Sequence, residues 1–322
     1  MHFYNKKAFV FSLFFIFTIV ACAILCFAFN KEKTSYKKYN LKFGATYMTM
    51  NNPFYEIIDN EIRSDVEARG DTLITRDPAL SVDKQIEQIK DFISMHVRAI
   101  FLNPVDLNKL HSVITEAKRA GIPVIVVDSP VINKNDASCT VVSDNYNAGV
   151  LCAKYLMSTR KSANIMILEH KEAQSAVDRI RGFEDTVKGH STYKIVARGD
   201  SIGQLENAMP ITETLLKKEP EINVIMALND PSALGAIASL KNHNMLSKVL
   251  VYGVDGSPEA KTMIKDGNMT ATAAQFPTQI GKTATEQMYS VINGKKHKNL
   301  CIIPIELISS QNIDKCDIDN WQ

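Results

Sequence analysis

The chain has 322 residues, of which 45% are hydrophobic and 22% charged, so it can bury a core and is long enough for two domains. Lysine and arginine total 37 against 35 acidic residues, a formal net charge of +2. This balance provides no overall field for a polyanion, and no nucleic-acid partner is expected.

An uncharged segment, Ala8 to Phe29, distinguishes the first 40 residues from the rest of the chain. Lysines flank it on both sides. As a helix it would be roughly 33 Å long at about 1.5 Å per residue, which matches a hydrocarbon core of about 30 Å. We therefore expect residues 1–40 to comprise a cytoplasmic stub, a transmembrane anchor or signal, and a linker.

Three interpretations of this segment remain open: an uncleaved anchor, a cleaved signal peptide, and a lipoprotein signal that ends at an acylated Cys22. The signal peptide fits least, because its apolar region is usually about 7–15 residues long and no A-x-A-like site follows. The lipoprotein signal has a small residue, Ala21, before the cysteine, but Ala23 to Phe29 stays apolar where a polar tether is expected. The uncleaved anchor is the preferred interpretation.

The cysteines and histidines show no spacing typical of a metal site. The six cysteines contain no C-x-x-C pair, so neither a metal nor a cofactor is expected. A disulfide between Cys301 and Cys316 is possible outside the cytoplasm, although free or simply packed thiols are the preferred interpretation. Lone histidines such as His96 and His170 are expected in surface or capping roles.

After the linker, short apolar runs alternate with amphipathic segments to the end of the chain. In the first amphipathic segment Phe54, Ile58, Ile62 and Val66 recur every four residues, which is typical of a helix face. Runs rich in valine and isoleucine indicate strands buried on both faces. Strict alternation predicts an α/β fold with parallel, doubly wound sheets, and about ten β-α units exceed what one open sheet usually holds. We therefore predict two Rossmann-like lobes.

Hydrogen-bonding side chains follow the predicted strands, at the edge where open parallel sheets bind ligands. Aromatic residues accompany them after the first strand. The residues singled out are Asn52, Phe54, Tyr55, Asn103, Asp128, Asn229, Asp255 and Gln275.

This set suits a small sugar. Carboxylates accept hydrogen bonds from neighbouring hydroxyls, amides both donate and accept, and aromatic rings cover C–H faces. Burying a polyhydroxylated ring requires partners for almost all of its hydroxyls. The alternative is that the Asp and Asn residues simply cap the next helix or start a turn.

Seven ordered motifs between about residues 41 and 305 resemble those of ribose-type periplasmic sugar-binding proteins of the type I fold, the substrate-binding proteins of ABC sugar transporters. They are MNNPFY (50–55), LNPVD (102–106), GIPVIVVD (121–128), VSDN (142–145), NDPSALG (229–235), GVDG (253–256) and AQFP (274–277).

The resemblance implies two lobes joined by three hinge crossings, placed near residues 143, 276 and 305. Residues 41–142 with 277–305 would form the N-terminal lobe, and residues 143–276 with 306–322 the C-terminal lobe. It also implies that Arg179 joins the ligand contacts named above, with Arg181 as the fallback. Ser129, Met48 and Gly203 depart from the ribose pattern, so the resemblance does not identify the sugar.

The resemblance implies a binding protein outside the cytoplasm, periplasmic or at the cell surface, and the apolar segment would anchor it by its N-terminus. It would deliver a monosaccharide or similar polyol to an ABC permease; alternatively, it would signal its closed state to a membrane sensor kinase or receptor. No enzymatic activity is expected, because no nucleophile and base lie at catalytic spacing and nothing marks either aspartate as the acid of a glycosidase pair. A sugar-responsive repressor is excluded, since the apolar segment occupies the position of its DNA-binding helices.

Overall fold

The computed structural model describes residues 40–322, and residues 41–322 form one compact unit. The predictions about an anchor, a signal and Cys22 lie outside the described residues. Within residues 40–322 no helix combines the length and apolar character needed to cross a bilayer.

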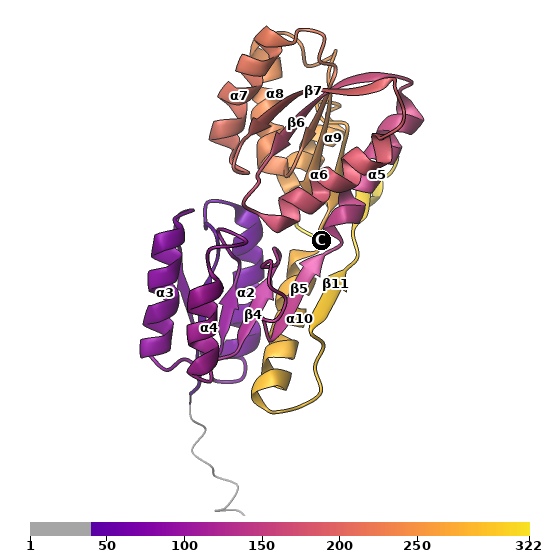
Figure 1. Ribbon diagram of the computed structural model, residues 1–322. Helices are drawn as coiled ribbons and strands as arrows, with labels where there is room; N and C mark the ends of the chain where they lie inside the picture. Colours follow the sequence, from indigo (N-terminus) through magenta and orange to yellow (C-terminus); the bar gives the residue numbers. More distant parts are fainter. Residues whose placement is uncertain (1–39) are drawn as a thin grey trace, which may run out of the picture. The chain divides into compact units, whose positions relative to one another are not determined.

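The unit contains two six-stranded α/β sheets, as the sequence predicted (Figure 1). The first sheet has the order β11-β5-β4-β3-β1-β2 and the second β12-β10-β9-β8-β6-β7. The strands of the first are β1 (Lys42–Thr46), β2 (Thr72–Arg76), β3 (Ile100–Leu102), β4 (Val124–Val127), β5 (Cys139–Ser143) and β11 (Leu300–Ile303). Those of the second are β6 (Ala163–Glu169), β7 (Tyr193–Asp200), β8 (Val224–Ala227), β9 (Leu250–Asp255), β10 (Ala271–Ala274) and β12 (Glu306–Ser309).

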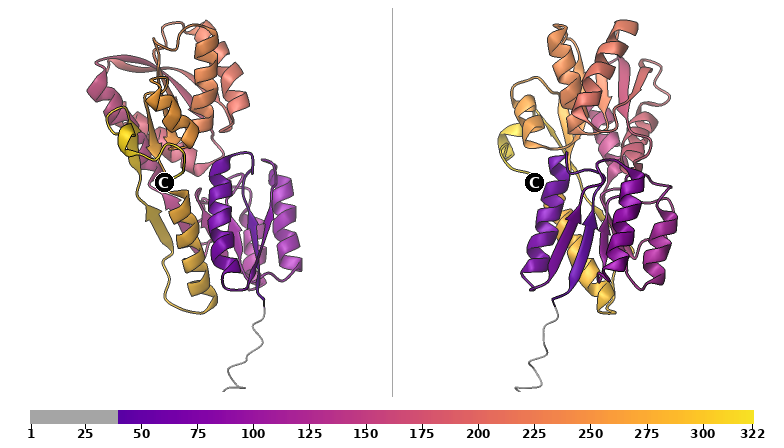
Figure 2. Two further views of the ribbon diagram at one scale, coloured as in Figure 1. Left: turned by 180° about the vertical axis from the view of Figure 1, so that it is seen from behind. Right: turned by 90° about the vertical axis from the view of Figure 1, so that its left-hand side faces the viewer.

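Helices cover both faces of each sheet (Figure 2). The first sheet lies between α2 and α10 on one face and α3 and α4 on the other, and the second between α5 and α6 and the group α7 to α9. The helices are α2 (Pro53–Glu67), α3 (Val82–Ser94), α4 (His111–Arg119), α5 (Asn145–Thr159), α6 (Gln174–Val187), α7 (Leu205–Lys218), α8 (Asp230–Asn242), α9 (Pro258–Lys265), α10 (Pro277–Ile292) and the 3-10 turn η1 (Ile313–Lys315).

Continuous apolar runs form the strands because each strand is buried on both faces. In β3, Phe101 packs into the core below α2 and α10, whereas Ile100 and Leu102 pack into the core below α3 and α4. A strand turns successive side chains to opposite faces, so an apolar residue is required at every position.

The chain passes between the two sheets three times: after β5, between β10 and α10, and between β11 and β12. Although α10 and β11 come late in the sequence, they pack beside β5 of the first sheet (Figure 1). The sequence analysis did not predict β12, which adds an antiparallel edge strand beside β10.

Candidate functional site

A narrow hollow lies beyond the carboxyl ends of the strands, where residues of both sheets meet. This is the edge at which doubly wound sheets bind ligands. Most of the predicted site residues line it: Asn52, Phe54, Tyr55, Asp128, Arg179, Asn229, Asp255 and Gln275.

Arg179 of α6 is the buried cation of this site, with 4% of its surface exposed. Its Nε donates to Asn145 Oδ1 at 2.7 Å, and its Nη1 donates to the Leu228 carbonyl oxygen at 3.0 Å. Nη1 also lies 3.5 Å from Asp255 Oδ1. The fallback residue Arg181 instead pairs with an aspartate at the protein surface. The fork of Arg179 is therefore held by both carbonyl and carboxylate oxygens.

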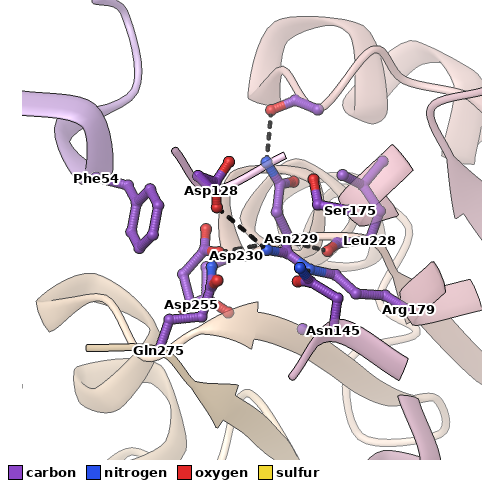
Figure 3. Close-up of polar contacts among 12 residues, drawn as sticks. Phe54, Asp128, Asn145, Ser175, Arg179, Leu228, Asn229, Asp230, Asp255 and Gln275 are labelled. Atoms are coloured by element: carbon purple, nitrogen blue, oxygen red, sulfur yellow. Dashed lines mark hydrogen bonds and ion pairs between the residues drawn. The ribbon is translucent and has the colours of Figure 1, made fainter. Parts of the chain in front are cut away.

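Two buried carboxylates from different sheets face Arg179, and each keeps one oxygen without a hydrogen-bond partner. Asp128 Oδ2 accepts from Asn103 Nδ2 at 3.2 Å, while its Oδ1 has no hydrogen bond. Asp255 Oδ1 accepts from Gln275 Nε2 at 2.7 Å, while its Oδ2 has no partner. In Figure 3 the ring of Phe54 lies on the other side of these carboxylates from Arg179. Because unpaired buried acceptors are costly, they indicate a place for a donor.

The electrostatics of the two carboxylates follow from their burial. Loss of water raises the pKa of Asp128, against the opposing effect of the Arg179 guanidinium. The pKa of Asp255 is raised well above its ordinary value, first by burial and then by the nearby charges of Asp230 and Asp128. A ligand group that donates a hydrogen bond to either ionised carboxylate would therefore offset the cost of burying its charge.

The backbone at both carboxylates is unusual. Asp128 has a φ of 63° and Asp255 a φ of 138°, in the region that L residues rarely adopt. Asp and Asn tolerate positive φ better than most residues, and strained backbone is concentrated at functional sites. The conformation directs each carboxylate from the end of its strand into the hollow.

The sequence left two interpretations open for the asparagines at the strand ends: contact with a ligand, or capping of the next helix. Asn103 does not line the hollow: its Oδ1 accepts from the Met48 amide, and its Nδ2 supports Asp128 from behind. Asn52 caps α2 and Asn229 caps α8, although both also line the hollow. The capping alternative therefore applies in part to both of these amides.

Several further residues line the hollow that the sequence analysis did not select. The expectation of a surface or capping role for His170 is wrong: it is 5% exposed and faces the hollow, and burial lowers its pKa. No spacing signal identified it, because it follows β6 as a single residue. Ser175 also lines the hollow, and its amide donates to Ser129 Oγ at 3.2 Å, which links the two lobes.

No cluster of three or more potential metal-ligating His, Cys, Asp or Glu side chains occurs in the described part of the chain. Cys139, Cys152, Cys301 and Cys316 are free thiols. Cys301 lies beside Cys139, and burial together with this neighbour raises the pKa of Cys139 to about 12.

Two α/β lobes with a polar, largely buried hollow between their strand ends define a two-lobe ligand-binding protein. The chain belongs to the family described as periplasmic binding protein domain, whose model matches residues 43–296. This is a family of substrate-binding proteins of transporters, so the chain is not an enzyme.

Individual relatives cover most of the chain. It is 29% identical to the ribose import binding protein RbsB of Bacillus subtilis over 91% of this chain and 95% of that protein. A solute-binding protein from Mycobacterium smegmatis, solved with bound glycerol, is 30% identical, has a TM-score of 0.81 and covers 85% of this chain and 96% of that one. A second, from Actinobacillus succinogenes with bound D-allose, is 25% identical, has a TM-score of 0.79 and covers 86% and 100%.

Proposed function

We propose that this protein binds a monosaccharide or a similar small polyol in the hollow between its lobes and delivers it to an ABC sugar importer. The ligand contacts would be the lining residues Asn52, Phe54, Tyr55, Asp128, Arg179, Asn229, Asp255 and Gln275. Asn103 supports Asp128 from behind.

One observation carries the proposal: three buried acceptor oxygens around the hollow accept no hydrogen bond, although Asp128 Oδ1 lies 3.9 Å from Arg179 Nη2. They are Asp128 Oδ1, Asp255 Oδ2 and Gln275 Oε1. Each requires a hydrogen-bond donor, and hydroxyl groups provide one at each carbon of a polyol. Arg179 adds donors for hydroxyl or ring oxygens, and Phe54 offers an apolar face. A polyol ring is the small ligand that matches all of these groups together.

The names of the relatives support the ligand class and the destination. The Bacillus subtilis relative is named for ribose import, and the solved relatives hold glycerol and D-allose. Delivery to an importer is therefore favoured over the sensory alternative, which none of these relatives supports.

Closure of the two lobes is the proposed mechanism. Residues 41–142 with 277–305 would move as one lobe and residues 143–276 with 306–322 as the other, because each range keeps its strands within one sheet. Asp128 belongs to the first lobe, and Arg179 and Asp255 to the second. A sugar that bridges them binds the closed state better and so shifts the population toward it.

The N-terminal segment supports placing the binding unit outside the cytoplasm and tethering it to the membrane. The supporting feature is the uncharged stretch from Ala8 to Phe29. Membrane fractionation of the full-length protein, with Cys22→Ser as the variant, separates an uncleaved anchor from a lipid anchor. Retention of the variant in the membrane fraction supports the helix, and its release supports acylation.

A thermal-shift screen of the full-length protein tests the binding proposal. The panel contains D-ribose, D-allose, myo-inositol and glycerol, with leucine as a non-polyol control. A ligand present at 100 times its Kd adds about 2.7 kcal/mol, so a bound polyol should raise Tm by roughly 5–10 °C. No shift across an extended panel of polyols, or a shift with leucine alone, would overturn the proposal.

A further inference from the structure

The last residues of the chain are fixed to the second lobe by a buried lysine. Lys261 of α9 has 0% of its surface exposed, and its Nζ donates to the carbonyl oxygens of Asp317 and Asn320. The side-chain amide of Gln322, in the orientation that satisfies both its polar atoms, accepts from Lys261 Nζ and donates to the Gly256 carbonyl oxygen. A buried ammonium with several carbonyl partners holds a segment in one conformation, because releasing it would leave the charge unpaired.

This anchoring determines where Trp321 lies. The residues on both sides of it are bound to Lys261, so its half-buried ring projects toward the other lobe. There it meets Phe54 of α2, with 5.6 Å between ring centroids and 59° between ring planes. The chain end lies at the level where the lobes meet in every view (Figures 1 and 2).

Phe54 is a lining residue of the hollow, whereas Trp321 is not. Trp321 instead lines a separate surface hollow together with Pro53 and Leu205. Phe54 also makes an edge-on contact with Tyr55, at 5.7 Å between centroids. The ring contact with Phe54 therefore connects Trp321 to the ligand hollow.

We propose that Trp321 is a positioning residue, which in the closed protein holds the Phe54 ring so that its face is presented to the sugar. The inference rests on the proposed sugar-binding function. Because Trp321 and Phe54 belong to different lobes, the contact forms on closure and adds to the stability of the closed state. Every ligand that closes the lobes gains from this contribution, and a ligand with an apolar ring face gains in addition from the oriented Phe54 ring.

Binding measurements on the full-length protein test this role. Trp321→Ala is expected to weaken D-allose and D-ribose binding about two- to tenfold, the range for one aromatic pair. Trp321→Phe should restore most of the affinity, and Trp321→Ala should weaken glycerol binding less than sugar binding, because glycerol loses only the contribution of the contact to closure. In the Phe54→Leu background, Trp321→Ala should have no further effect, because the two residues act as a unit. Lys261→Met, which releases the segment, should weaken sugar binding as Trp321→Ala does.

A second readout follows the ring contact by fluorescence. Trp321 is the chain's single tryptophan, so all indole emission reports on this residue. Sugar binding should reduce the quenching of Trp321 fluorescence by acrylamide. In the sugar-bound, closed protein, Phe54→Leu should increase this quenching.

The outcomes separate this inference from the proposed function. If the sugars bind and Trp321→Ala binds them as wild type, the sugar-binding function stands and the positioning role is overturned. A fall in Tm of the free protein with an unchanged Kd indicates a purely structural contact and also overturns it. If no polyol binds, the proposed function fails. The positioning role rests on that function and is then overturned with it.

Discussion

Asp255 offers a sharp test of the site, because its role in binding and its role in stability should have opposite signs. Asp255→Asn keeps the size of the side chain, suits the positive φ and removes the charge. Removing one partner of a buried, hydrogen-bonded charge pair typically costs about 2–5 kcal/mol of binding, or about 30-fold to several thousandfold in Kd. Isothermal titration with the best polyol from the thermal-shift panel measures this loss.

The same substitution should not destabilise the ligand-free protein. Burial and two neighbouring acidic groups make the Asp255 charge unfavourable, as its raised pKa indicates, while Arg179 keeps Asn145 and the Leu228 carbonyl oxygen as partners. The Tm without ligand should stay constant or rise, as expected where a site is built at some expense of stability. Asp266→Asn, at an exposed position of the same lobe, is the matched control and should change neither quantity. Wild-type affinity in Asp255→Asn would refute the assignment.

Three further predictions concern the surroundings of the site. Sugar affinity should fall as pH is lowered from the alkaline to the acidic range. Burial raises the pKa values of Asp128 and Asp255, and hydroxyl donors favour the ionised carboxylates, so binding is strongest above the raised pKa values and is lost as the carboxylates become protonated. Titration calorimetry across this range would contradict the idea if Kd stayed flat. Asn103→Leu should lower the unfolding free energy by about 1–3 kcal/mol in urea denaturation, because it leaves buried polar groups unpaired; an unchanged midpoint would argue against that support. Gly149→Ala should lower the unfolding free energy by about 1–3 kcal/mol, since its Cβ would lie 1.9 Å from the Arg179 carbonyl oxygen. It should also weaken sugar binding by shifting α6. A wild-type unfolding free energy together with a wild-type Kd would show that the helices separate freely.

Local patterns were sufficient wherever local interactions decide the structure. Asn52 followed by Pro53 predicts the start of α2, and the Asn52 side chain does accept from the Phe54 amide. Apolar runs predict strands buried on both faces, and these strands carry Asp128 and Asp255 to their carboxyl ends. Parallel strands end at one edge of a sheet, so residues far apart in sequence were expected to converge there.

Choices between similar residues required the packed structure. Arg179 and Arg181 lie two positions apart on α6, and contacts with α5 and the second sheet bury the first and leave the second at the surface. Both polar atoms of the Asn103 amide make hydrogen bonds within the protein, to Met48 and to Asp128. This arrangement depends on the spacing of neighbouring strands. His170 has no partner spacing in the sequence, yet its position after β6 turns it into the hollow.

Periodicity and capping act over a few residues, so the amino-acid pattern was enough to predict the alternation of strands and helices, the two-lobe α/β class and the polar residues at the strand ends. The tertiary structure alone decided which polar atoms stay unpaired around the hollow, and that Trp321 reaches Phe54. Both depend on contacts between segments far apart in the sequence, such as Arg179 with Asp255 and Phe54 with the chain end. No local pattern encodes the distance between such segments, which is set when the two lobes pack together.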